Sequence, residues 1–417
     1  MKMPFFRVFI DNDEKREITD LIESFRYEDS IKEDNLLELR MYSKFVENFE
    51  EDKDLITGAI LIFQFGYLGQ ETSITQTIRI TDLNYRYADK ITLTIKALDK
   101  GTKMKKTTSN KVWKNVNTKD IVEEIAGRYG MDYKVEGSLT TWPSVPQSNF
   151  SDFEFLQQLA LREKDGNYIV YVYGNELRFI RRGLNRKSIM TMIYGRGSGN
   201  VLSFTPKHKE SSSKSASVGT MITGFDPKTK QVVSSKSDNS NEKNSITLGD
   251  FKSVYDEQGD KLGIEKDGII TNAADKVFDN VTKIQNRLIG NTSNQTELDN
   301  IANNLKKESD LKNMRADLTT MGNPLIESND IITMAGVLDR HKGNYLIEKV
   351  VHSITDSGYV TTSSLLKNGK YVPTKSNADK ANTKAGNEQD DKKEVVNVYD
   401  ANGNKLTDTT DNYDEPR

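Results

Sequence analysis

The stretch RHKGNYLIEKVVHSI, residues 340–354, contains two of the protein's three histidines within a run of strand-forming residues. Val350, His352 and Ile354 stand two residues apart, so in a strand their side chains point to one face. His341 falls in the segment DRHKG, whose polar residues and glycine are typical of a turn between strands. The stretch therefore predicts a turn followed by a strand, with His352 on the face that Val350 and Ile354 share.

These histidines could form a metal or proton-transfer site, or they could be packed side chains in a sheet. Zinc takes three or four converging ligands, but His341 and His352 are eleven residues apart and the chain contains no cysteine. Histidine is commonly half-buried in protein cores. We therefore interpret His352 as structural, and we expect His208, in the polar segment TPKHKE, to be solvated. No catalytic, cofactor-binding or metal residue is assigned, and no cofactor is expected.

Strand patterns also dominate the N-terminal part of the chain, residues 1–98. Apolar residues at 91, 93, 95 and 97 alternate with Thr92, Thr94 and Lys96, and residues 77–81 alternate in the same way. The segment FQFGYLGQ, residues 63–70, places glycines between aromatic strand formers, as a bend or bulge would. We expect an antiparallel sheet or a small barrel.

Residues 99–190 change in character and predict an α/β lobe. A lysine- and threonine-rich linker is expected at 99–117, followed by a helix capped by Thr118 and stopped by Gly130. Ser151 and Glu154 have the spacing of a capping box at the start of a second helix. Residues 168–180 predict a hairpin whose turn is Gly174–Asn175.

The rest of the chain predicts a second β region that is interrupted by an insertion. Strands are expected at 191–226 and again at 318–370. Between them, residues 227–317 are polar, but they include one predicted helix with Leu298, Ile301, Ala302 and Leu305 on one face. The last stretch, residues 371–417, has few core-forming residues, which favours an extended or flexible tail.

The composition excludes several classes of protein. Lysine and arginine number 59 against 62 acidic residues, a formal net charge of −3, so no basic excess points to specific nucleic-acid binding. The absence of cysteine excludes disulfides, thiolate nucleophiles and cysteine-ligated zinc. The N-terminal sequence MKMPFFRVFIDNDE lacks the features of a signal peptide, and no window has the length of apolar residues that a membrane span needs. We expect synthesis in a cytoplasm.

Three motifs superficially suggest chemistry. GRGSGN, residues 195–200, precedes a strand rather than a helix, so a glycine-rich turn is favoured over a phosphate loop. Asp256, Gln258 and Asp260 resemble part of a calcium loop, but no glutamate closes it. Glu123 and Glu124 are adjacent on a predicted helix and point about 100° apart, so they do not face a shared substrate.

A short internal sequence similarity relates the insertion to the tail. VYDEQGDKL, residues 254–262, matches VYDANGNKL, residues 398–406, in six residue types. Both segments predict hairpin turns, most clearly at Asn402–Gly403. Two explanations are compatible with this similarity: two turns that use the same residue types independently, or a duplicated docking hairpin.

The segment at 322–365, GNPLIESNDIITMAGVLDRHKGNYLIEKVVHSITDSGYVTTSSL, resembles the end of the phage late-control D family. The matching residues are Gly322, Pro324, Gly343, Tyr345, Val350, His352, Gly358, Tyr359 and Thr361, with Ile347 in place of a valine. The block QSNFSDFEFLQQLALREKDGNYIVYVYGNELRF, residues 147–179, and ITGFDP, residues 222–227, are also similar to segments of that family. The resemblance spans about residues 55–366.

The resemblance implies a central hub of a contractile-tail baseplate or of a related injection system. Its expected fold is mainly β, of the α+β class: two tube-type β-barrel domains, an α/β middle lobe and an inserted segment, with three chains forming a pseudo-six-fold ring. The implied domains are a first barrel at 1–98, a middle lobe at 99–190, a second barrel at 191–226 and 318–370, an insert at 227–317 and a tail at 371–417.

The implied role is structural rather than enzymatic. The hub would join the six-fold tail tube to a three-fold spike and would line the delivery channel. Its implied partners are two further copies of itself, the tube protein, a separate spike protein, wedge and inner baseplate proteins, and the C-terminus of the tape-measure protein. It would reside in the tail baseplate of a virion or of a phage-derived particle that is assembled in a bacterial cytoplasm.

Two other functions stay open at the level of the sequence. The first is a tail-tip hub that carries a cell-wall hydrolase in residues 227–317. A hydrolase needs an apolar cleft, and the aromatic residues there are few: Phe251, Tyr255 and Phe278. The second is a soluble binding protein unrelated to tails, which would be a stable monomer.

Overall fold

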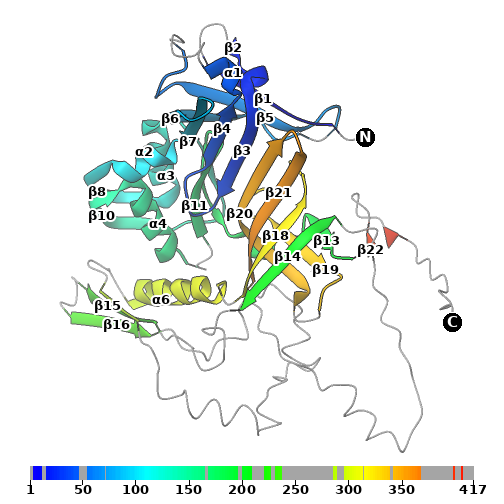
Figure 1. Ribbon diagram of the computed structural model, residues 1–417. Helices are drawn as coiled ribbons and strands as arrows, with labels where there is room; N and C mark the ends of the chain where they lie inside the picture. The colour runs from blue at the N-terminus through cyan, green and yellow to red at the C-terminus, as the bar shows by residue number, and fades with distance from the viewer. Residues whose placement is uncertain are drawn as a thin grey trace, which may run out of the picture. The chain divides into compact units, whose positions relative to one another are not determined.

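The computed structural model describes residues 3–11, 16–46, 54–70, 72–164, 168–195, 200–208, 220–226, 231–236, 285–288, 295–312, 314–338, 341–367, 398–399 and 405–406. The chain divides into two compact units, Met1–Val372 and Pro373–Arg417. The first unit is mainly β. It contains one continuous thirteen-stranded sheet, a middle lobe of helices and short sheets, and a small sheet packed against one long helix (Figure 1).

The first lobe is built from the N-terminal strands. They are β1 (Pro4–Ile10), β2 (Arg16–Glu17), β3 (Ile22–Ser30), β4 (Leu36–Met41), β5 (Ile60–Tyr67), β6 (Gln76–Arg86) and β7 (Thr92–Leu98), together with the short helical segments η1 (Thr19–Leu21) and α1 (Ser43–Val46). Leu93, Ile95 and Ala97 are buried and alternate with less buried residues along β7, as the sequence predicts. The inward side chains of all these longer strands share one apolar core. Burying a large apolar side chain contributes about 1.5–3 kcal/mol to stability, so this core is the main source of the stability of the lobe.

The middle lobe contains three helices and two small sheets. Its elements are α2 (Gly101–Lys106), β8 (Thr108–Asn117), α3 (Thr118–Arg128), β9 (Asp132–Val135), β10 (Thr141–Ser151), α4 (Asp152–Arg162), β11 (Tyr168–Tyr173), β12 (Glu176–Arg181) and η3 (Gly183–Asn185). The capping box of Ser151 and Glu154 at the start of α4 is confirmed, and β11 and β12 form the predicted hairpin.

Two local predictions for this lobe are wrong. Residues 99–117 are not a linker, because Met104 and Trp113 join the core of the lobe from α2 and β8. Helix α3 is capped by Asn117, which accepts a hydrogen bond from the backbone N–H of Lys119 at 2.9 Å. Thr118 is fully buried, and its hydroxyl is held by Glu163 and Trp142 instead.

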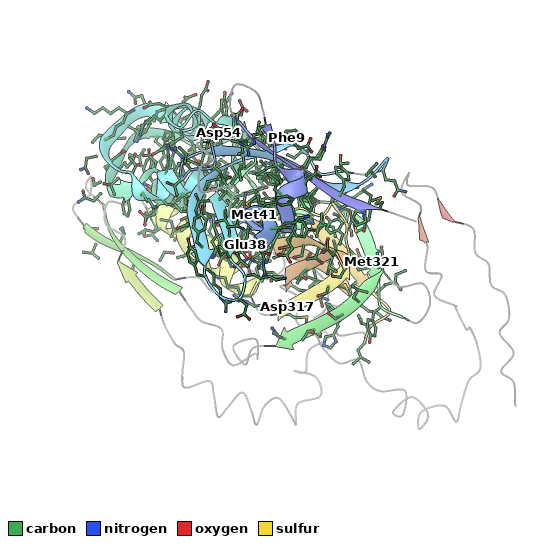
Figure 2. All side chains as sticks on the ribbon, turned by 45° about the horizontal axis from the view of Figure 1, so that its top comes forward. Phe9, Glu38, Met41, Asp54, Asp317 and Met321 are labelled. Atoms are coloured by element: carbon green, nitrogen blue, oxygen red, sulfur yellow. The ribbon has the colours of Figure 1, made fainter. Side chains whose placement is uncertain are left out.

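The second lobe continues the large sheet. Its strands are β13 (Met190–Ile193), β14 (Val201–His208), β18 (Met314–Met321), β19 (Ile331–Ala335), β20 (Gly343–Thr355) and β21 (Gly358–Lys367). Strand β18 begins four residues before the expected boundary at 318, because Met314 and Ala316 pack into the core of this lobe. Figure 2 shows side chains filling both lobes, with Met41 buried in the first and Met321 exposed at the second.

Strand β20 joins the two lobes into one sheet. One edge of β20 pairs with β21 along almost its whole length. The other edge is divided, because residues 343–346 pair with β19 while residues 349–354 pair with β3 of the first lobe. The pairing with β21 shifts register between Ile347 and Lys349, at the point where this partner changes. A bulge bends and twists a strand, which allows β20 to serve both lobes.

A separate module contains β15 (Thr220–Asp226), β16 (Gln231–Lys236), β17 (Gln285–Leu288) and α6 (Gln295–Asp310). Strand β15 pairs with β16 and β17, so residues 220–226 lie outside the sheet of the second lobe, to which the sequence assigned them. The predicted apolar face of α6 is confirmed: Leu298, Ile301 and Ala302 are buried and Leu305 is partly buried. Helix α6 also contacts α4 of the middle lobe.

The second unit is described at two short strands, β22 (Val398–Tyr399) and β23 (Lys405–Leu406). They pair antiparallel, which agrees with the hairpin predicted around Asn402–Gly403. Several sequence motifs lie outside the described residues. They are the segment 254–262, which includes the residues that resemble part of a calcium loop, and most of GRGSGN. The side chain of His208 also lies outside them.

Candidate functional site: the junction of three lobes

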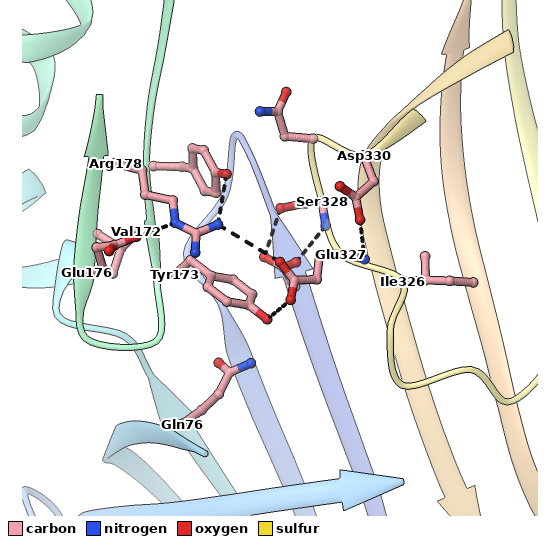
Figure 3. A network of polar contacts seen from close by, with 12 residues as sticks. Gln76, Val172, Tyr173, Glu176, Arg178, Ile326, Glu327, Ser328 and Asp330 are labelled. Atoms are coloured by element: carbon pink, nitrogen blue, oxygen red, sulfur yellow. Dashed lines mark hydrogen bonds and ion pairs between the residues drawn. The ribbon is translucent and has the colours of Figure 1, made fainter. Parts of the chain in front are cut away.

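The strongest concentration of buried polar contacts lies where the loop before β19 meets both other lobes. We call this the three-lobe junction and define it by Asp29, Tyr173, Arg178, Glu327, Ser328 and Asn329. Asp29 lies on β3, Tyr173 and Arg178 lie on the β11–β12 hairpin, and the other three lie in the loop. The junction thus draws one or more side chains from each lobe (Figure 3).

Asp29 fastens the loop to the first lobe. Its Oδ2 accepts a hydrogen bond from the backbone N–H of Ser328 at 2.7 Å, and its Oδ1 accepts one from the Ser328 hydroxyl at 2.9 Å. Asp29 is 1% exposed and Ser328 is 3% exposed. Both contacts are therefore shielded from water, where an unpaired polar group would cost about 1–3 kcal/mol.

The middle lobe holds the same loop through Glu327. The Tyr173 hydroxyl donates to Glu327 Oε1 at 2.5 Å, and Arg178 Nη1 lies 4.0 Å from Glu327 Oε2. Arg178 is itself fixed, since its Nε donates to Glu176 at 2.6 Å and its guanidinium carbon lies 4.2 Å from the centre of the Tyr173 ring. Figure 3 shows Tyr173 and Arg178 approaching Glu327 from the hairpin side.

Asn329 locks the loop against the end of β12. Its Oδ1 accepts a hydrogen bond from the Gly183 N–H at 2.9 Å, and its Nδ2 donates to the Arg181 carbonyl at 3.4 Å. Asn329 has φ +69°, a left-handed conformation that asparagine tolerates better than most residues. Gly183 is required by space, because a Cβ there would lie 2.4 Å from the Asn329 carbonyl oxygen.

A second polar contact joins the first lobe directly to the middle lobe. The Asn35 side chain donates to the Val172 carbonyl at 2.8 Å and accepts from the Ser30 N–H at 3.0 Å. Its backbone N–H donates to Asp99 Oδ2 at 2.9 Å. The turn after β3 is thereby tied to β11, beside the three-lobe junction.

Burial changes the protonation of these carboxyl groups. Loss of hydration raises the pKa of Asp29 to about 7, although the hydrogen bonds from Ser328 and the charge of Arg178 oppose the rise. Burial likewise raises the pKa of Asp99 to about 7 and that of Asp330 to about 6. The junction and its immediate surroundings therefore contain acids that ionise near neutral pH.

His352, on β20, is 2% exposed and packs between the lobes. Its Nδ1 lies 2.8 Å from the Tyr359 hydroxyl and its Nε2 lies 3.2 Å from the Ile326 carbonyl oxygen. A carbonyl can only accept, so Nε2 carries the proton and Nδ1 accepts from Tyr359. Burial lowers the pKa of His352 to about 3, so the ring is neutral. His341 lies in a turn, where its carbonyl accepts a hydrogen bond from the Tyr345 hydroxyl.

The contacts of the junction hold the three lobes together. Ser328 is a nucleophile by type, but its hydroxyl donates to Asp29, and both ring nitrogens of His352 already have other partners. Among the described residues, no group of three or more His, Cys, Asp or Glu side chains could hold a metal ion. None of the helices that the structure describes has the length and apolar character that a membrane crossing requires.

The sequence alone did not single out the junction residues. Asn329 and Asp330 stand in ESND, which carries only a turn signal before a strand. Asp29 is one of four charged residues in β3, with Glu23, Arg26 and Glu28, so its charge alone did not mark the contact. Tyr173 and Glu327 are 154 positions apart, and no local pattern relates them.

Comparison with solved structures defines the class of fold. The crystal structure of a 43 kDa tail protein of prophage MuSo2 from Shewanella oneidensis has a TM-score of 0.58 at 14% sequence identity, covering 88% of this chain and 99% of that one. The crystal structure of a tail protein from Neisseria meningitidis MC58 has a TM-score of 0.60 at 9% identity, covering 88% and 98%. The chain is mainly β and has the fold of these tail proteins.

The family follows from a sequence model. The model described as the Alg8 N-terminal domain matches residues 43–253 and 198–356. Because these matches extend over more than half of the chain, the protein belongs to the Alg8 N-terminal domain family. No curated protein sequence matches the chain.

Proposed function

We propose that the protein is the central hub of a contractile-tail baseplate. The observation that carries the proposal is the single sheet in which β20 joins two lobes, in a chain whose fold is that of prophage tail proteins. The late-control D resemblance supports the same role through Gly322, His352 and Tyr359. Gly322 contacts Tyr359, because a Cβ there would lie 2.0 Å from the ring, and His352 binds the Tyr359 hydroxyl.

In this proposal each chain supplies two tube-type domains, the first at 1–98 and the second built from β13, β14 and β18 to β21. Three chains would form a ring of six similar lobes around a delivery channel. The ring would bind the six-fold tube protein on one side and a separate three-fold spike protein on the other. Wedge proteins and the C-terminus of the tape-measure protein would be further partners, and the particle would be a virion tail or a related injection system.

The lobe contacts support a structural rather than an enzymatic role. A hub must transmit force between a tube and a spike without its lobes separating. The buried contacts of Asp29, Glu327 and Asn329 connect all three lobes within one chain. A neutral hydrogen bond such as those of Asn329 contributes about 0.5–1.5 kcal/mol and one to a charged carboxylate about 1.5–3 kcal/mol, so together these bonds resist separation.

Co-expression with the neighbouring tube and spike genes tests the proposal. Affinity purification of the tagged hub should recover a complex that contains three copies of it together with spike protein. Recovery of the hub alone as a stable monomer would contradict the proposal. The hydrolase alternative would be supported instead if the purified chain reduced the turbidity of a peptidoglycan suspension.

A further inference from the structure

The large sheet has two strand edges, one on each of its lobes, that no other described strand covers. Strand β14 pairs with β18 along one side, and no described strand pairs with its other side (Figure 1). On β6, the pairing with β5 ends at Arg79, and backbone bonds from Ile80 to residues 58 and 59 extend it by one residue. Among the described strands, residues 82–86 of β6 therefore pair with β7 alone. We call these segments the open edges of β14 and β6.

Strand β1, near the end of the strand order, is an edge of a different kind. It contacts β20, and the ring of Phe6 on β1 stacks on that of Phe25 on β3 with centroids 5.2 Å apart. The first lobe therefore closes on itself at β1. The open edges of β6 and β14 are the ones that a further strand could extend.

The strands at the two open edges run in opposite directions. The path from β14 to β6 passes through β18, β21, β20, β3, β4 and β7, and each neighbouring pair on it is antiparallel. With eight strands on this path, β6 runs opposite to β14. Copies that face the same way around a ring would therefore bring β14 of one chain antiparallel to β6 of the next. Head-to-tail contacts of this kind close into rings.

The side chains along the two open edges are complementary on both faces of the sheet. Phe204 on β14 packs against the core of the second lobe, and Leu83 on β6 packs against the core of the first. Tyr85 follows on the same face as Leu83 and is 37% exposed. If Phe204 lies opposite Tyr85, strand alternation places the exposed Lys207 opposite the exposed Asp82 on the other face. Aromatic pairs and opposite charges both favour cross-strand pairing.

We propose that the open edge of β14 pairs antiparallel with the open edge of β6 in a second copy of the chain, with Phe204 opposite Tyr85. This inference rests on the proposed three-chain ring. Within one chain, the pairing of β20 with β3 already joins the second lobe to the first, and the new pairing repeats that kind of joint between chains. Proline and lysine protect an edge strand from indiscriminate pairing, so Pro206 and Lys207 favour one matched partner over any exposed strand.

Disulfide cross-linking of the full-length protein tests this pairing, because the chain has no cysteine of its own. With Phe204 opposite Tyr85, Thr205 lies opposite Asn84, and both of these side chains are exposed. Thr205→Cys and Asn84→Cys chains that are co-expressed and oxidised should give a covalent two-chain product on a non-reducing gel. A chain that carries both substitutions should give a covalent three-chain product.

Asp317→Cys is the matched control for Thr205→Cys. Asp317 is the partner of Thr205 on β18, so it lies on the same face but one strand farther from the open edge. Strands are spaced about 4.8 Å apart, which places Asp317 about 10 Å from Asn84 and beyond the reach of a disulfide. Asp317→Cys combined with Asn84→Cys should therefore give no cross-link.

Each outcome decides the proposal. Cross-linking between positions 205 and 84 without cross-linking in the control supports it. Ser203→Cys with Arg86→Cys, a second pair in the same register, gives the answer if the first variants do not fold. The mass of the reduced protein in solution separates this pairing from the hub proposal. Three-chain particles that do not cross-link, or that cross-link equally in the control, overturn the pairing but leave the ring. Single chains at concentrations where tails assemble would contradict both.

Discussion

Asp29 and His352 are both buried, and burial makes stability depend on pH in opposite directions at the two residues. The pKa of Asp29 is raised to about 7, so its contribution is largest when it is protonated and is lost as pH rises through about 7. The pKa of His352 is lowered to about 3 from an ordinary 6.5, so its contribution is present above pH 6.5 and is lost as pH falls toward 3. The two residues therefore limit stability from opposite sides of neutral pH.

Asp29→Asn should stabilise the protein more at pH 8 than at pH 5, because the penalty for the buried carboxyl grows as pH rises from about 4 to about 7. Asparagine is neutral at both values, and it can accept from the Ser328 N–H while donating to the Ser328 hydroxyl. The charged groups that face Asp29 are Glu327, which raises its pKa, and Arg178, which lowers it. We expect the gain in urea unfolding at pH 8 to exceed that at pH 5 by about 1–3 kcal/mol, since the folded carboxyl ionises between these two pH values.

Asp317→Asn is the control for that experiment, because Asp317 is about half exposed and pairs with Lys207 on the surface. Its effect should differ little between pH 5 and pH 8. An Asp29→Asn effect of equal size at both pH values would show that the Asp29 carboxyl does not titrate in this range.

His352→Gln should leave the metal content at zero and should lower stability. The ring packs with its centroid 4.7 Å from that of Phe65, and glutamine cannot reproduce this contact together with both hydrogen bonds. We expect a loss of about 1–3 kcal/mol in urea unfolding. Elemental analysis provides the second readout. Stoichiometric zinc or iron in the wild type that disappears in the variant would assign His352 a ligand role.

At the scale of elements, prediction succeeded where the pattern was local. The alternation at 91–97, the capping box at Ser151 and the apolar face of α6 are all present, because each depends on residues within a few positions of one another. The interpretation of residues 99–117 as a linker was wrong. Many lysines and threonines are typical of a linker, but Met104 and Trp113 within this segment are buried by partners that are distant in the sequence. The divided edge of β20 could not be predicted either, because it depends on β3, more than 300 residues away.

Gly322 at the end of β18 gives a prediction at this scale. Gly322→Ala should destabilise the protein by about 2 kcal/mol or more, because the new Cβ would lie 2.0 Å from the Tyr359 ring and would push it from His352. Gly127→Ala is the matched control. Gly127 is exposed within α3 with nothing near its Cβ position, so alanine should stabilise the helix by up to about 1 kcal/mol. Thermal unfolding of both variants measures the difference, and equal effects would mean that the ring has room to move.

At the scale of the whole molecule, the sheet and the junction act together to make one unit of three lobes. The β20–β3 pairing joins the first and second lobes through the backbone, and the junction adds the middle lobe through side chains. A chain organised in this way holds its first and second lobes at a fixed separation, as the proposed ring of three chains would require.

Deletion of residues 371–417 should leave the proposed three-chain ring intact while weakening its attachment to a neighbouring protein. The paired strands β22 and β23 are the motivation, since a hairpin can add to the edge of another sheet. The measurements are the mass of the purified truncated hub and the occupancy of spike protein on assembled tails. Normal spike occupancy and normal tail stability in the truncated form would remove the docking role.

The most direct test of the hub proposal is an image reconstruction of the purified full-length protein by electron microscopy, computed without imposed symmetry. We predict a three-fold particle in which six similar lobes, two from each chain, surround a central channel. Two-fold symmetry, or a population of single chains at concentrations where tails assemble, would contradict the account.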